Sequence, residues 1–327
     1  MNDDTARITG EAAGAPNGKR YVLVYSDAYV VDIGPHVFPV AKFPLVVEGL
    51  MRTCGVSREE FIEPTPPTRE QLLLVHTPDY LDDLTQLRWT RRTATSELPL
   101  TREIADAYIM AAGGTLLAAR EAIERRGFGI HIGGGFHHTF ADHAEGFCYV
   151  NDIAVALRVL QKEGRIRRAA VVDCDVHQGN GTAHIFRNDA SVFTFSIHQE
   201  NNYPVKQQSD LDIGLRDGAT DEEYLEGMAT VIPSRLDAFA PDLVIYVAGA
   251  DPYEEDMLGG LALTEEGLAR RDDGVIGYCA ERSIPIASVL AGGYAADTYD
   301  TVELHVATCG KMLEAARRAS GLSLLKG

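Results

Sequence analysis

The stretch AAVVDCDVHQGNG, residues 169–181, begins as an apolar run and ends in carboxylate, imidazole and amide side chains. A short run of small and β-branched residues is typical of a strand that is buried on both faces of a sheet. Polar residues directly after such a strand lie at its carboxyl end, where open parallel sheets bind their ligands. This stretch therefore predicts a buried parallel strand with a functional site at its end.

Similar apolar runs recur along the chain and alternate with segments of helical periodicity. The predicted strands are 21–25, 129–133, 169–176, 192–197, 243–249 and 284–292, and the predicted helices are 101–126, 151–164, 221–240 and 265–283. Such alternation indicates an α/β fold in which helices cover a parallel sheet. The chain shows no repeat or internal linker, so we predict a flexible tail over 1–19 and one catalytic domain over 20–327.

Composition and charge narrow the class of protein. Of 327 residues, 45% are hydrophobic and 24% charged, which is typical of a soluble globular protein. The formal net charge of −18 opposes binding to nucleic acid or to an anionic membrane surface. The five cysteines form no CxxC pair, and no apolar run approaches the roughly 20 residues of a membrane span. We therefore expect a cytoplasmic protein without a disulfide framework, a membrane span or a nucleic-acid partner.

Three other predicted strands also end in residues that can carry chemistry. The strand at 129–133 leads to His137 and His138, the strand at 243–249 to Asp251, and the strand at 284–292 to Gly292, Gly293 and Tyr294. Because carboxyl ends of parallel strands meet at one edge of a sheet, these side chains are expected to converge there.

The pattern DCDVH places Asp173, Asp175 and His177 two residues apart, so they share one face if the strand continues that far. A divalent cation removes the repulsion between neighbouring carboxylates. Asp175, His177 and the separate Asp251 would offer two oxygens and one nitrogen and leave a position open, as catalytic zinc sites do. The alternative is that the two aspartates form a turn or a helix cap and that His177 is a hydrogen-bonded core histidine.

The adjacent His137 and His138 fit the proton transfers that amide hydrolysis needs. Imidazole has a pKa near neutrality, so it can accept a proton from water and return it to a leaving group. Tyr294, which follows two glycines, could donate a hydrogen bond to a developing oxyanion. Alone, either motif would more often be structural. Their combination with a metal-type cluster favours a hydrolytic site.

Four segments together resemble the zinc-dependent histone deacetylase family: GGFHHTFADHAEGFCYVND (134–152), VVDCDVHQGNG (171–181), AGADPYEEDMLGGL (248–261) and AGGY (291–294). The run DVHQGNG and residues 241–272 are most similar to the class IV branch. The resemblance implies an arginase/deacetylase fold with a parallel sheet of about eight strands. It also implies a Zn²⁺ ion bound by Asp175, His177 and Asp251.

The resemblance further implies a role for each remaining site residue. His137 would pair with Asp173, His138 would act as general base and then general acid with Asn180 as its partner, and Tyr294 would polarise the acyl carbonyl. The implied tunnel residues are Gly146, Phe147, Tyr203, Leu258, Gly292 and Gly293. A monovalent cation, K⁺ or Na⁺, would bind at Asp173, Asp175, His177, Ser196 and Ile197.

This chain departs from the family pattern at three positions. Many relatives have Asp where this chain has Asn180, and a neutral partner would leave the pKa of His138 lower. The rim aspartate that grips the substrate backbone has no clear counterpart, and Glu97 is only a candidate. Leu258 occupies the position where polyamine deacetylases carry an acidic gatekeeper.

The implied activity is zinc-dependent hydrolysis that removes acetyl or longer fatty acyl groups from lysine side chains or similar amines. The partner would be an acylated protein, an acylated peptide or an acylated small amine, and the class IV likeness favours tolerance of fatty acyl groups. Two alternatives stay open. A binuclear manganese ureohydrolase would need further carboxylates in DxHxD arrangements, and a non-catalytic acyl-lysine binding module would not need the full set of catalytic side chains. The sequence makes no prediction of the oligomeric state.

Overall fold

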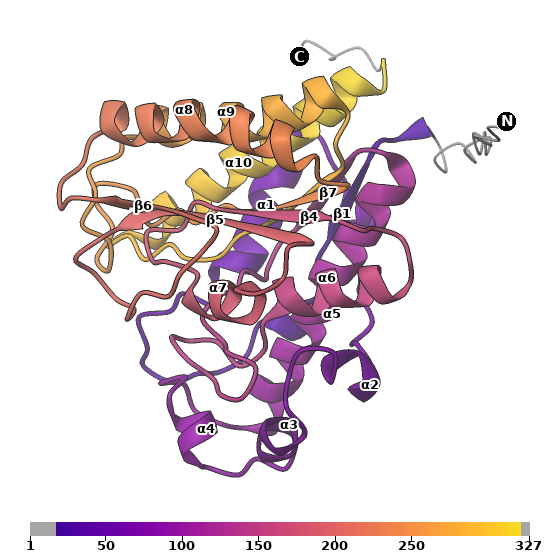
Figure 1. The fold of residues 1–327 in the computed structure, drawn as a ribbon, viewed down its shortest axis with the longest axis vertical. Helices are drawn as coiled ribbons and strands as arrows, with labels where there is room; N and C mark the ends of the chain where they lie inside the picture. The colour runs from indigo at the N-terminus through magenta and orange to yellow at the C-terminus, as the bar shows by residue number, and fades with distance from the viewer. Residues whose placement is uncertain (1–17, 322–327) are drawn as a thin grey trace, which may run out of the picture.

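A central sheet of eight parallel strands organises the computed structural model, which describes residues 18–321 (Figure 1). The strands are β1 (Tyr21–Val24), β2 (Phe61–Ile62), β3 (Phe128–His131), β4 (Ala169–Asp173), β5 (Val192–Gln199), β6 (Leu211–Leu215), β7 (Leu243–Val247) and β8 (Ile286–Val289). Their order is β2-β1-β3-β8-β7-β4-β5-β6, and all neighbours are parallel. The predicted α/β fold, with about eight parallel strands, is confirmed.

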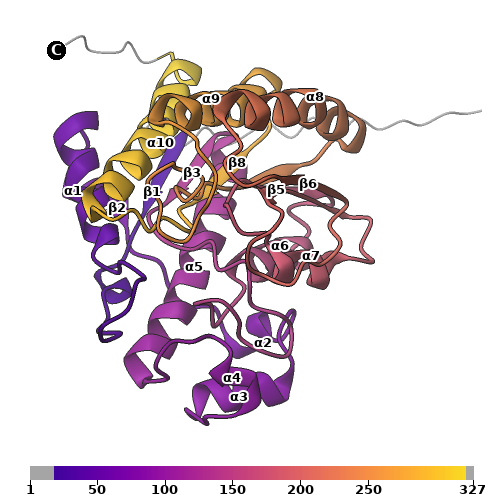
Figure 2. The ribbon, with the colours of Figure 1, turned by 90° about the vertical axis from the view of Figure 1, so that its left-hand side faces the viewer.

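Helices cover both faces of this sheet (Figures 1 and 2). One layer contains α8 (Asp221–Phe239), α9 (Glu265–Arg282) and α10 (Thr298–Ala319), with α1 (Lys42–Cys54) packed against α10; the other contains α5 (Arg102–Arg125), α6 (Asp152–Lys162) and α7 (Asn180–Phe186). The short helices η2 (Asp27–Tyr29), η3 (Arg58–Glu60), α2 (Arg69–Leu72), α3 (Pro78–Thr85) and α4 (Arg91–Ala94) lie in the connections. Every residue of β4 and β7 is buried, because the two layers enclose the middle of the sheet.

The long helix α5 approaches the sheet closely because small residues line its inner side. A Cβ atom on Gly114 would lie 2.2 Å from Nε2 of His131 and 2.4 Å from the hydroxyl of Tyr29. Those two groups are themselves hydrogen-bonded at 2.9 Å. Thr101 caps the start of the helix, because its hydroxyl accepts a hydrogen bond from the backbone N–H of Ile104.

The strand that contains the DCDVH motif is shorter than predicted, and this corrects the expected geometry. β4 ends at Asp173 and not at residue 176, so Asp173, Asp175 and His177 do not alternate along one strand. The carboxylate of Asp173 accepts from the backbone N–H of Asp175 at 3.2 Å, and that of Asp175 accepts from the N–H of His177 at 2.9 Å. Side-chain oxygens thus replace a neighbouring strand as acceptors, and the backbone turns at the edge of the sheet.

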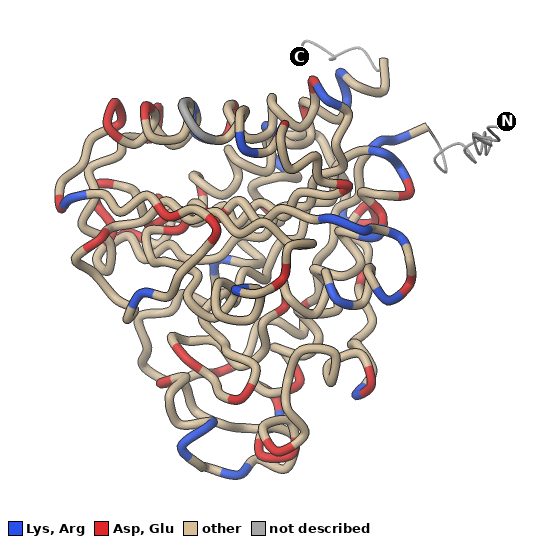
Figure 3. Tube along the Cα trace, in the orientation of Figure 1, with Lys and Arg blue, Asp and Glu red and all other residues tan. Residues whose placement is uncertain are grey.

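The structure also describes part of the predicted tail and shows where the charged residues lie. Residues 1–17 of the tail lie outside the described residues, whereas Lys19 forms an ion pair with Glu60. Acidic and basic residues are interspersed over the trace in Figure 3, and the acidic ones are the more numerous. None of the helices formed by residues 18–321 combines the length and the apolar character that a membrane span requires.

Candidate active site and metal centre

Asp175, His177 and Asp251 form a buried group at the carboxyl ends of β4 and β7. Their potential ligand atoms all lie within 4.8 Å of one another. Nδ1 of His177 is 3.2 Å from Oδ1 of Asp175 and 3.3 Å from Oδ2 of Asp251. Among the described residues this is the one group of three or more metal-capable side chains. The distances suit a single divalent ion bound by two carboxylates and one imidazole.

The electrostatics of this group also fit a metal ion. Burial alone would lower the pKa of His177, but hydrogen bonds to the two aspartates raise it to about 10. Burial and the neighbouring Asp175 carboxylate raise the pKa of Asp251 to about 7. Oδ2 of Asp251 is fully buried, and apart from the contact with Nδ1 of His177 at 3.3 Å it has no hydrogen-bond partner in the described part of the chain. A cation bound here would balance the negative charge of the two buried carboxylates.

The turn after β8 closes the other side of the group. The backbone N–H of Gly292 donates to Oδ2 of Asp175 at 2.8 Å, and a Cβ atom at Gly292 would lie 1.9 Å from Oδ2 of Asp251. Only glycine permits this approach to both carboxylates. Gly293 lies next to it and faces Ala250 and Thr301.

The histidine pair lies beside the metal-capable group, and each ring has a different partner. Nδ1 of His137 is 2.7 Å from Oδ2 of Asp173, and Nδ1 of His138 is 2.8 Å from Oδ1 of Asn180. The two Nε2 atoms lie 3.1 Å apart. Burial alone would lower the pKa of both imidazoles. The carboxylates of Asp173 and Asp175 nevertheless raise that of His137 to about 9, whereas burial and the neighbouring histidines hold that of His138 well below its ordinary value. His138 is therefore the neutral member of the pair.

Asn180 connects His138 to a residue that sequence reasoning missed. Nδ2 of Asn180 donates to Oε1 of Glu145 at 2.7 Å, and the hydroxyl of Tyr203 donates to the same oxygen at 3.1 Å. Nothing in the sequence pairs residue 145 with residue 180, because the contact depends on how the 134–152 loop folds back onto α7.

A cavity of about 180 Å³ leads from the surface to His138 and His177. It is lined by Glu97, His138, Gly146, Phe147, His177, Asn202, Tyr203, Leu258 and Tyr294. The ring of Tyr294 is centred 6.5 Å from that of His177 and 6.1 Å from that of Phe147. Burial and the site aspartates raise the pKa of Tyr294 well above its ordinary value, so its hydroxyl stays a hydrogen-bond donor.

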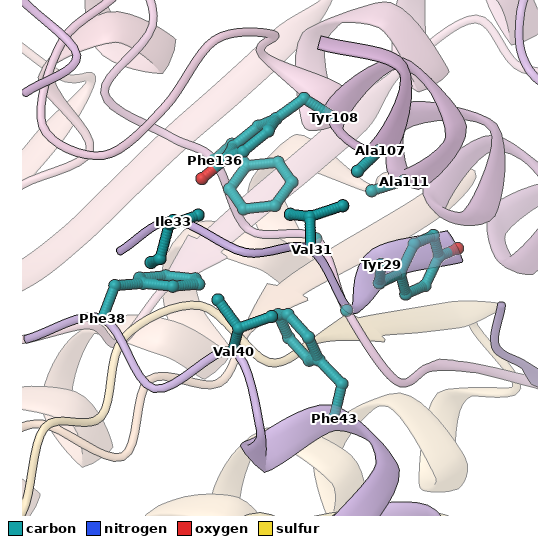
Figure 4. Close-up of a pocket in the computed structure, with 12 residues that line it drawn as sticks. Tyr29, Val31, Ile33, Phe38, Val40, Phe43, Ala107, Tyr108, Ala111 and Phe136 are labelled. Atoms are coloured by element: carbon teal, nitrogen blue, oxygen red, sulfur yellow. The ribbon is translucent and has the colours of Figure 1, made fainter. Parts of the chain in front are cut away.

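A separate apolar pocket of about 20 Å³ lies beside Phe136 and Phe38 (Figure 4). Phe38 lines both this pocket and the inner end of the active-site cavity. Lys42 is fully buried beside it and donates from Nζ to the carbonyl of Ala291 at 2.6 Å. Sequence reasoning missed Lys42, because lysine is rarely buried.

The residues of the predicted monovalent-cation site also come together. Asp173 and Ser196 are register partners on β4 and β5, and Ile197 follows on β5. Asp175 and His177 lie just beyond the end of β4.

Comparison with known proteins gives concordant results. Residues 36–309 match the model of the histone deacetylase domain family. The chain is 42% identical to an uncharacterized protein of Picosynechococcus over 289 residues; this alignment covers 87% of this chain and 96% of that protein. It is 31% identical over 287 residues to histone deacetylase 2 of Arabidopsis thaliana, covering 83% and 74% of the two chains.

A solved structure gives the same result for the fold. The crystal structure of the HDA15 HD domain superposes with a TM-score of 0.75 at 24% identity, covering 91% of this chain and 93% of that one. The family match spans every residue of the metal-capable group, the histidine pair and Tyr294. The chain therefore belongs to the histone deacetylase family.

Proposed function

We propose that this chain is a zinc-dependent amide hydrolase that removes acyl groups from lysine side chains or similar amines. The observation that carries the proposal is the convergence of three elements on one cavity: the buried Asp175–His177–Asp251 group, the neutral His138 and the hydroxyl of Tyr294. Family membership supports the same reaction class.

Zinc, held by Asp175, His177 and Asp251, would supply Lewis-acid chemistry by acidifying water and withdrawing electrons from the acyl carbonyl. Nε2 of His138 takes a proton from the attacking water and later returns it to the leaving amine. His137, anchored on Asp173, orients its neighbour and adds positive charge beside the developing oxyanion.

The remaining residues select and enclose the substrate. The hydroxyl of Tyr294 donates a hydrogen bond to the carbonyl oxygen as it gains charge. Phe147 and Tyr203 would wall the lysine stem, with Gly146, Leu258 and Gly292 around them, and this enclosure would exclude water from the site; Gly293 does not line the cavity. A K⁺ or Na⁺ ion at Asp173, Asp175, His177, Ser196 and Ile197 would brace the metal centre from behind.

The dimensions of the inner pocket favour short acyl groups. The inner end of the active-site cavity, beside His138, Gly292 and Tyr294, has a volume of about 20 Å³, which suits a water-sized group such as the methyl of an acetyl group. A long fatty chain, which the class IV likeness favours, would have to pass Phe38 and Phe136, which line both this inner end and the apolar pocket. We therefore place acetyl-lysine first and long-chain acyl-lysine second.

A single set of assays tests the proposal. The purified protein is analysed for metals and assayed with acetyl-lysine and decanoyl-lysine amides that carry a fluorogenic leaving group, and with arginine for urea release. We expect zinc in about equimolar amount, loss of hydrolysis with a chelator and recovery with zinc. Urea release with manganese would favour the ureohydrolase alternative, and acyl-lysine binding without turnover would favour the binding module.

A further inference from the structure

Glu145 occupies the first position of a tight turn beside the start of α7. The backbone groups of Glu145 and Cys148 exchange two hydrogen bonds, at 3.2 Å and 3.0 Å. The two central residues, Gly146 and Phe147, have φ angles of 51° and 60°. Two successive left-handed residues identify a type I′ turn, a compact and well-defined geometry. The N–H of Phe147 donates to the carbonyl of Ser96 at 2.8 Å and anchors the turn. Glu145 is thus held by the backbone.

The carboxylate of Glu145 is well supplied with donors. Oε1 accepts from Asn180 at 2.7 Å and from Tyr203 at 3.1 Å, and Oε2 lies 3.5 Å from Nε2 of His143. Its side chain is 23% exposed. Burial alone would raise the pKa of Glu145, but hydrogen bonds from His143, Asn180 and Tyr203 hold it below its ordinary value. The group is therefore an anion at neutral pH, and it can only accept hydrogen bonds.

An acceptor at this position fixes the orientation of the Asn180 amide. The NH₂ group must point to Glu145, so the amide oxygen points to Nδ1 of His138, 2.8 Å away. That oxygen also only accepts, so Nδ1 of His138 carries the hydrogen. A neutral imidazole has one N–H, and the lone pair is left on Nε2, the atom that faces the site.

We propose that Glu145 is a positioning residue that, through Asn180, holds His138 in the tautomer whose Nε2 can accept a proton. This inference rests on the proposed amide-hydrolase function. An aspartate at position 180 would make the contact without help, because both its oxygens accept. An asparagine can turn either end toward the imidazole, and therefore needs a second group that selects one orientation.

Three variants of the zinc-loaded enzyme test the role by steady-state kinetics. Glu145→Ala removes the acceptor and lets the amide reverse, so kcat falls roughly tenfold to hundredfold while KM changes little. Glu145→Gln keeps an acceptor oxygen in place and retains kcat within about threefold. Glu303→Ala, which removes an exposed glutamate on α10 that pairs with Arg52, is the matched control and leaves kcat unchanged.

The sharpest test is a double-variant cycle. Asn180→Asp alone sets two carboxylates against each other at the present 2.7 Å contact, and we expect kcat to fall at least roughly tenfold. Adding Glu145→Gln converts this repulsion into a hydrogen bond from the new amide, so the double variant should recover to within about threefold of Glu145→Gln. A merely structural role for Glu145 predicts additive losses, and additivity overturns the inference.

A readout independent of turnover separates this inference from the proposed function. ¹⁵N NMR of histidine-labelled protein reports which nitrogen of His138 is protonated, with the signal among ten histidines assigned by a His138→Gln variant. We expect Nδ1–H in the wild type and Glu145→Gln, and a shift toward Nε2–H in Glu145→Ala. A wild type without acyl-lysine hydrolysis refutes the proposed function. A tautomer that is the same in wild type and Glu145→Ala refutes the role of Glu145.

Discussion

Replacing Tyr294 with Phe removes one oxygen atom from the cavity and leaves the ring in place. The residue is 8% exposed, and its ring packs against Phe38, Phe147 and His177 at centroid distances of 6.3, 6.1 and 6.5 Å. Within residues 18–321 its hydroxyl has no hydrogen-bond partner and faces the cavity. Folding loses no hydrogen bond in the variant, so the free energy of unfolding should stay within about 0.5 kcal/mol of the wild type.

Catalysis should respond differently, because the hydroxyl is needed only when charge develops on the acyl oxygen. Removal of one such donor typically lowers kcat by about 10²–10³, or about 3–4 kcal/mol. KM should change much less, since the neutral carbonyl of the bound substrate accepts a weaker hydrogen bond. The variant should therefore combine wild-type stability and metal content with very low turnover.

The assay is steady-state hydrolysis of a fluorogenic acetyl-lysine amide, with zinc content and Tm measured on the same samples. Tyr278→Phe is the matched control, because this buried tyrosine on α9 donates to Asp237, away from the site. It should leave kcat unchanged. The reasoning is refuted if Tyr294→Phe retains more than about a third of wild-type kcat, or if its loss of activity parallels a loss of zinc.

Three further outcomes follow from buried groups. Asp251→Asn should lower zinc content and activity together, as measured by elemental analysis and kinetics, because the variant loses one of the two negative charges of the metal-capable group. Lys42→Met should lower kcat, because the turn at Ala291 loses the hydrogen bond from Lys42. The free energy of unfolding in urea should change little, because the roughly 1–3 kcal/mol cost of the unpaired Ala291 carbonyl is offset by removal of a buried charge. Burial lowers the pKa of His76 to about 4, so below about pH 6.5 the unfolded chain binds more protons than the folded one, and the free energy of unfolding decreases as the pH is lowered. In urea unfolding, His76→Gln should remove about 2 kcal/mol of the decrease between pH 7 and pH 5.

The sequence predicted six of the eight strands, because these strands are apolar on both faces. The strands it missed lie at the two edges of the sheet. β2 has only two residues, and in β6 the polar Asp212 and the small Gly214 interrupt the apolar pattern. Edge strands contact helices less and water more, so their composition carries a weaker signal.

At the site, residues that end strands were predictable, and residues that act through turns were not. Parallel topology brings Asp175, Asp251 and Tyr294 to one edge whatever the details of the loops. Asp173 and Asp175 accept hydrogen bonds that form a turn, as one interpretation of DCDVH predicted, whereas metal binding by Asp175 and His177 stays a prediction. Glu145 and Lys42 depend on loop conformation and on a buried cation, for which a single sequence gives no periodic pattern.

Asn180, which stands where many relatives have Asp, affects the strength of the proposed general base, His138. A carboxylate in direct contact with His138 would stabilise the imidazolium and raise its pKa. Here Asn180 makes that contact, and the carboxylate of Glu145 lies one hydrogen bond farther away.

The orientation of the His138 ring and the charge beside it are therefore set by different residues. The amide fixes the ring while contributing no net charge, and the anion acts on the amide. The imidazole keeps the low pKa that burial and its cationic neighbours give it, and it stays unprotonated at neutral pH. Such a base accepts a proton less readily than one held by aspartate, but it returns that proton to a departing amine more readily, which is the harder transfer when the leaving group is as basic as lysine.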